Sequence, residues 1–69
     1  MTYFNQQDRQ YLYNELEGAL IETNHTTQDV RNILQDCKRM NNVTLRDLCV
    51  NYMPDILDNL NYNRNRRTN

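Results

Sequence analysis

The chain has 69 residues, of which 38% are hydrophobic and 25% are charged, and its formal net charge is -1 at pH 7. A chain this short forms one domain with a small core, which a second subunit would enlarge. One glycine and one proline are too few for the many turns of an all-β fold. We therefore expect an all-α protein, a compact three-helix bundle that assembles as a homodimer.

The cysteines and the N-terminal segment bear on the compartment. Two cysteines, Cys37 and Cys49, are too few for a disulfide-stabilised scaffold. The first ten residues, MTYFNQQDRQ, lack the basic and apolar segments of a signal peptide. No apolar run approaches the length of a membrane span. These features predict a cytoplasmic protein with reduced thiols and no membrane partner.

The first predicted helix runs from about Gln6 to Glu22. Its apolar residues follow the i, i+4, i+7, i+8 spacing of a single helical face, and Phe4 extends that face at its start. Gly18 in the helix interior indicates either close packing or simple tolerance. The apolar stripe is Leu12, Leu16, Ala19 and Leu20. Four further side chains lie at its edge or off it: Tyr11 at the edge, and Tyr3, Tyr13 and Ile21 off it.

A second helix is predicted after the turn TNHTTQDV and ends near Met40. Thr26 and Asp29 match the capping pattern in which a hydroxyl residue is followed three positions later by an acid. His25, directly before that cap, is interpreted as an exposed or capping loop residue. The apolar stripe of this helix is Val30, Ile33, Leu34, Cys37 and Met40. The side chains predicted to face away from it are Arg31, Gln35, Lys38 and Arg39.

The third predicted helix lies in the segment TLRDLCVNYMPDILDNL. The capping pattern recurs at Thr44, with Val43 and Leu48 as a hydrophobic pair around the cap. A proline in a helix interior costs about 3 kcal/mol, but Pro54 is predicted on the solvent side and the apolar spacing continues in phase across it. We therefore predict one helix bent at Pro54, with a break and a fourth helix starting at Pro54 as the alternative. The apolar stripe is Leu45, Leu48, Cys49, Tyr52, Met53, Ile56, Leu57 and Leu60.

Residues 63–69 are predicted to form a flexible basic tail after a single helical domain of residues 1–62. The tail holds three arginines and no acid, whereas the rest of the chain has five basic and nine acidic residues. Arginine binds phosphate in a bidentate manner, so Arg64, Arg66 and Arg67 are the candidate nucleic-acid contacts. Three phosphate contacts give only weak, salt-sensitive binding, which makes nucleic acid the less favoured partner.

Catalytic and cofactor-binding patterns are missing from the sequence. It has no serine and a single glycine, which excludes serine catalysis and a glycine-rich phosphate loop. His25, Cys37 and Cys49 match no zinc-ligand spacing. A thiol on an apolar stripe is a buried hydrophobe rather than a nucleophile. We expect no enzyme activity, no catalytic residue, no metal, no cofactor and no small-molecule ligand.

The remaining candidates are surfaces. Tyrosine is enriched in binding hot spots, and Tyr3, Tyr11 and Tyr13 gather near one end of the first helix. Val50, on the flank of the third helix, is a candidate for a dimer seam. These four residues are the predicted partner-binding set of a non-enzymatic regulator or inhibitor, of viral or mobile-element type, that binds a protein. The alternatives are a dimeric nucleic-acid-binding transcriptional regulator that uses the arginine tail, and a structural subunit of a larger assembly.

Overall fold

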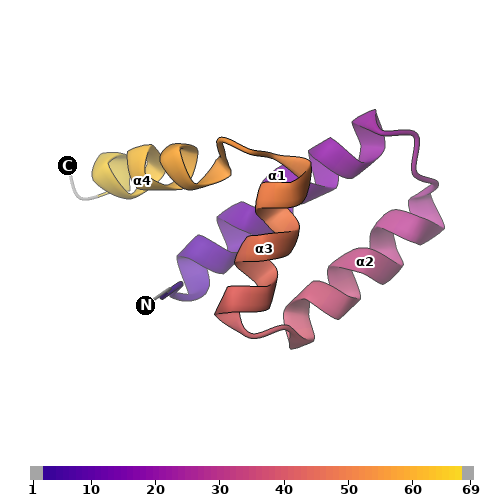
Figure 1. Ribbon diagram of the computed structural model, residues 1–69, viewed down its shortest axis with the longest axis horizontal. Coiled ribbons are helices and arrows are strands. Elements are labelled where there is room, and N and C mark those ends of the chain that lie inside the picture. The colour runs from indigo at the N-terminus through magenta and orange to yellow at the C-terminus, as the bar shows by residue number, and fades with distance from the viewer. Residues whose placement is uncertain (1–2, 68–69) are drawn as a thin grey trace.

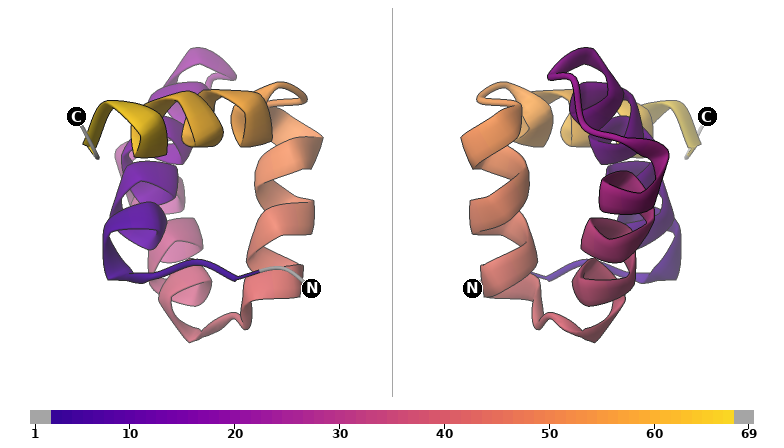
Figure 2. Two further views of the ribbon diagram at one scale, coloured as in Figure 1. Left: turned by 90° about the vertical axis from the view of Figure 1, so that its left-hand side faces the viewer. Right: turned by 90° about the vertical axis from the view of Figure 1, so that its right-hand side faces the viewer.

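The computed structural model describes residues 3–67, and every regular element within them is a helix. Four helices follow in order: α1 (Gln6–Glu22), α2 (Thr27–Arg39), α3 (Asn42–Tyr52) and α4 (Ile56–Arg67). α1 packs against each of the other three, and α4 also packs on α3 (Figures 1 and 2). The prediction of a compact all-α fold is confirmed, whereas the prediction of three helices is wrong.

Side-chain caps define the starts of the first two helices. At α1, the Asn5 side chain accepts the Asp8 N–H at 2.8 Å, while the Asn5 N–H donates to the Asp8 carboxylate at 3.0 Å. This reciprocal capping box satisfies two N–H groups that a helix start leaves unpaired. At α2, the Thr26 hydroxyl accepts the Asp29 N–H at 3.1 Å, as predicted. The predicted bounds of α1 match the observed ones.

α3 begins earlier than predicted. Asn41, not Thr44, is the N-cap, and its side chain accepts the Thr44 N–H at 2.8 Å. Asparagine caps a helix as well as threonine does, and the earlier start leaves a connection of only Met40 and Asn41 after α2. Val43 is 48% exposed, so the predicted hydrophobic pair around Thr44 does not form the start of the helix.

The chain breaks at Pro54, so the bent-helix prediction is wrong. Met53 has φ -139° and ψ 84°, the extended type of conformation to which a following proline restricts a residue. The Ile56 N–H bonds the Met53 carbonyl at 3.0 Å, which closes a turn between α3 and α4. Pro54 is exposed, as predicted. The apolar spacing stays in phase because both helices pack on the same core.

The core lies where α1 crosses the other helices. The buried apolar side chains come from every helix and from the segment before α1. They are Phe4, Leu12, Leu16, Leu20, Val30, Cys37, Leu45, Cys49, Ile56 and Leu60. All of these are residues of the predicted stripes except Phe4, which was predicted to extend the first stripe at its start. Other stripe residues, including Leu48, are only half-buried and pack around this centre.

The predicted flexible tail is instead helical through Arg67, while residues 68 and 69 lie outside the described residues. The Arg64 guanidinium binds the Asp8 carboxylate through two hydrogen bonds, at 3.1 and 2.8 Å, and also donates to the Tyr3 carbonyl at 2.9 Å. The Asp8 side chain is only 1% exposed. This ion pair ties the last turns of α4 to the start of α1.

Candidate functional site: a groove between α1 and α2

The predicted tyrosine surface is not a single surface. Tyr3 is 71% exposed and lines a depression beside α4. Tyr13 is half-buried and lines a different depression between α1 and α2, where its hydroxyl accepts the Arg9 Nε–H at 2.9 Å. Tyr11 is half-buried and donates to Glu15 at 3.4 Å. Burial raises the pKa of Tyr11, and the Glu15 carboxylate adds to that rise. The three rings therefore lie at different places on the molecule and do not form one surface.

The surroundings of Val50 and of the described C-terminal arginines differ from those predicted. Val50 is half-buried and packs against the core, which leaves little of it for a dimer seam. Arg64 is held by Asp8, and this hydrogen bonding raises the pKa of the guanidinium. The Arg66 guanidinium lies over the Tyr62 ring, 6.0 Å from its centroid. The side chain of Arg67 lies outside what the structure describes.

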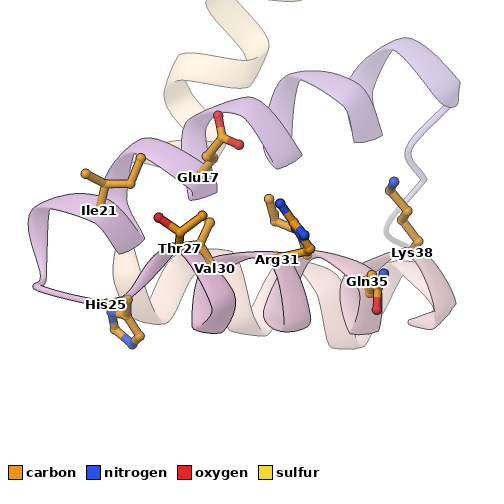
Figure 3. A pocket seen from close by; sticks show the side chains of 9 residues that line it. Glu17, Ile21, His25, Thr27, Val30, Arg31, Gln35 and Lys38 are labelled. Carbon is orange, nitrogen blue, oxygen red and sulfur yellow. The ribbon is translucent and has the colours of Figure 1, made fainter.

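A groove lies between α1 and α2 (Figure 3). It has a volume of about 470 Å³ and is open to solvent. α1 contributes Glu17 and Ile21, and α2 contributes Val30 and Leu34 along its apolar side. Ile21 is 60% exposed. The other lining residues are His25, Thr27, Arg31, Gln35 and Lys38.

Arg9 fixes the relative position of the helices at one end of this groove. Its Nη2 donates to the carbonyls of Cys37 and Met40, at 3.0 and 2.9 Å. Its Nη1 donates to the Asn42 side chain at 2.7 Å. A cation on the last carbonyls of a helix satisfies acceptors that the helix end leaves unpaired. One side chain of α1 thus holds both the end of α2 and the start of α3.

His25 and Asn24 fix the other end, at the α1–α2 turn. Asn24 has φ 67°, a left-handed conformation that asparagine tolerates. The His25 N–H donates to the Leu20 carbonyl at 3.2 Å, and its ring Nδ1 lies 3.1 Å from the same oxygen. The ring also meets Tyr52 of α3 edge to face, at 6.1 Å between centroids. The interpretation of His25 as a capping loop residue is confirmed.

The cations of the groove differ from most other basic side chains in having no interaction partner among the described residues. Among residues 3–66, whose side chains the structure describes, Arg9, Arg46, Arg64 and Arg66 each have a polar or aromatic partner. Three cations form no hydrogen bond or ion pair within that range, and all three lie on α2: Arg31, Lys38 and Arg39.

Arg31 and Lys38 point in nearly the same direction. They are seven residues apart, which is two helical turns and about 10 Å along the axis. Both line the groove, and Lys38 also lines the adjoining depression that contains Tyr13. At 100° per residue, the two acids of α2, Asp29 and Asp36, lie about 150° away on the opposite side. The groove therefore has a basic wall that no acid of α2 neutralises.

The thiols do not contribute a reactive site. Cys37 and Cys49 are free and fully buried. Burial raises the pKa of both thiols, that of Cys49 to about 11, while Arg9 acts in the opposite direction. Within residues 3–67, no three His, Cys, Asp or Glu side chains are arranged to hold a metal ion. No helix in that range has the length and apolar character needed to cross a membrane.

Sequence reasoning found the components of the groove but not the groove itself. Ile21 was placed off the apolar stripe of its helix, and Arg31 and Lys38 were predicted to face away from the stripe of theirs. All three side chains are exposed, but they line the groove between the two helices. An aliphatic residue off its stripe was the signal for an unpartnered apolar surface. No known family, curated protein or solved structure matches this chain, so its function has to be inferred from its own residues.

Proposed function

We propose that this protein is a small non-enzymatic regulator that binds a helical segment of a protein in the groove between α1 and α2. The observation that carries the proposal is Ile21, which is 60% exposed beside a basic wall whose cations lack partners within the described residues. Full burial of an isoleucine side chain is worth about 1.5–3 kcal/mol, so a partner that covers Ile21 gains a substantial part of that. Buried reduced thiols suit a cytoplasmic location.

The shape of the groove favours a helix as its occupant. Addition of a strand needs an exposed sheet edge, and residues 3–67 contain no strand. Proline-rich ligands dock on grooves lined by aromatic rings, whereas the main groove has no Phe, Tyr or Trp in its lining. Two helices with an apolar floor between them match the remaining mode, in which an amphipathic helix inserts its apolar face. The 13 residues of α2 span about 20 Å, enough for a partner helix of three to four turns.

Affinity capture from extracts of the source cells, with and without nuclease, tests this function. Ile21→Lys places a charge in the groove without disturbing the core, because the native side chain is mostly exposed. Tyr62→Lys is the matched control, since Tyr62 is 67% exposed on α4. We expect the wild type and the control to retain the same protein after nuclease treatment and Ile21→Lys to lose it. Equal retention by all three would contradict the proposed site.

A nucleic-acid-binding regulator is the second candidate, but with different contacts from those expected. The observation that favours it is a set of three cations on α2 that form no hydrogen bond or ion pair within residues 3–66, namely Arg31, Lys38 and Arg39. Arg64, in contrast, is engaged with a buried carboxylate. If phosphate is the ligand, the affinity should fall with salt at a log–log slope of about -2 to -3 for three contacts. Neutral replacement of Arg31 and Lys38 should then remove most of that slope.

A further inference from the structure

We propose that the groove is also occupied by α1 of a second copy of this chain, which makes the protein a symmetric dimer. This inference rests on the proposed function, because it names one occupant of the same site. In such a dimer the α1 helices lie side by side near the twofold axis, and each inserts between α1 and α2 of the other copy. The dimer covers the groove, so self-association and the binding of another protein exclude each other.

Charge spacing is the first argument. Glu15 and Glu22 are exposed on α1 and, like Arg31 and Lys38, are seven residues apart. Two acids spaced by two turns can each meet one cation of an equally spaced pair on a helix packed alongside. The chain thus carries both halves of a complementary pattern on two different helices. An exposed ion pair is worth little alone, but a twofold axis repeats each pair.

The surface between the two acids is the second argument. Gly18 lies between Glu15 and Glu22 on the same flank of α1, and a Cβ added there would meet no atom within 4 Å. Within the described part of the chain, nothing therefore packs directly against Gly18. A glycine leaves the backbone bare, which lets a second helix approach closely. The sequence left two explanations for Gly18, close packing or simple tolerance. Within one copy of the chain Gly18 faces open space, so it is not required there by close packing.

The order of residues around α1 is the third argument. At 100° per residue, Ile21 lies about 100° from Glu22. The acidic flank of Glu15, Gly18 and Glu22 lies on the side of α1 roughly opposite the buried leucines Leu16 and Leu20, which pack toward the core. When α1 enters the groove of another copy, its Ile21 side can face the other α1 while its acidic flank faces the cations of the other α2. One arrangement therefore buries the exposed isoleucine and pairs all four charges.

Sedimentation equilibrium on the full chain tests this arrangement through two charge-reversed variants. One variant carries Arg31→Glu and Lys38→Glu, and the other carries Glu15→Arg and Glu22→Arg. The four native side chains are exposed, so both variants should fold, which circular dichroism checks. We expect the wild type to form dimers of two 8.4 kDa chains and each variant alone to dimerise at least about tenfold more weakly.

The mixture of the two variants gives the decisive outcome. In a mixed dimer every acid again faces a base, so the 1:1 mixture should associate about as tightly as the wild type. Ile21→Lys should also weaken the wild-type dimer, with Tyr62→Lys unchanged. The inference is overturned if the wild type is a monomer at high concentration or if mixing restores nothing. In either case, loss of partner capture by Ile21→Lys would still support the proposed function, so the two failures are distinguishable.

Discussion

Removal of the Arg64 side chain is expected to destabilise the fold strongly. Arg64→Met keeps much of the aliphatic stem but leaves the Asp8 carboxylate, which is 1% exposed, without its bidentate cation. Loss of one partner of a buried pair costs about 3–5 kcal/mol. Because the Arg64 side chain is itself 37% exposed and the Asn5 N–H still donates to Asp8, we reduce this to about 2–3 kcal/mol.

Thermal unfolding followed by circular dichroism measures this effect. For a domain of this size, 1 kcal/mol shifts Tm by about 4–8 °C, so a shift of roughly 10–20 °C is expected. Arg66→Met is the matched control, because Arg66 contacts only the exposed ring of Tyr62 among the interactions described for it. Its Tm should change by no more than a few degrees. If Arg64→Met has the same Tm as the wild type, the ion pair does not hold α4 on α1. That result would support a flexible C-terminal tail instead.

Three further predictions follow from single positions. Pro54→Ala should keep the fold and lower its stability by about 0.4–1 kcal/mol in urea, because proline restricts the unfolded chain; a large gain would instead indicate that α3 and α4 fuse into one helix. Gly18→Ala should raise the stability of the monomer by up to about 1 kcal/mol in the same assay, since the site is open, and a loss would mean that the flank is covered within one copy. Burial raises the pKa of the Cys49 thiol from 9.0 to about 11. The thiol therefore ionises at a lower pH in the unfolded state than in the folded state. The free energy of unfolding, unaffected by this group below pH 9, should decline by about 2–3 kcal/mol as the pH rises toward 11. Cys49→Ala should decline less over that range, and equal slopes would show that the thiol is not the cause.

The sequence predicted local structure well where one face of a helix is buried. The leucines of α1 and the Thr26 cap lie where periodicity and cap chemistry place them, because both signals are local. The break at Pro54 was misjudged because in-phase apolar spacing cannot distinguish a bent helix from two helices on one core. The position of α4 across α1 is stabilised by the ion pair between Arg64 and Asp8, which are 56 positions apart in the sequence. Local sequence patterns do not report such a distant contact.

The candidate site was harder to predict, because it depends on the distance between two helices. The tyrosines were chosen for their chemistry, but the fold disperses them among separate surroundings. Arg31 and Lys38 carry no signal as single solvent-facing cations. They become a site only when α2 lies beside Ile21 of α1, in a groove where neither cation forms an ion pair within residues 3–66.

Photo-crosslinking from inside the groove tests the proposed function most directly. A photoreactive aromatic amino acid replaces Gln35, which is exposed and lines the groove, and in a control protein it replaces Tyr62 on α4. In extracts of the source cells, the probe at position 35 should form crosslinks to protein, and those crosslinks should disappear when Ile21→Lys is added. Crosslinks to the segment 15–22 in a product with the mass of two 8.4 kDa chains would identify the second copy as an occupant, because a crosslink within one chain leaves the mass unchanged. Crosslinks from position 62 alone, or from position 35 without any effect of Ile21→Lys, would contradict the groove as the binding site.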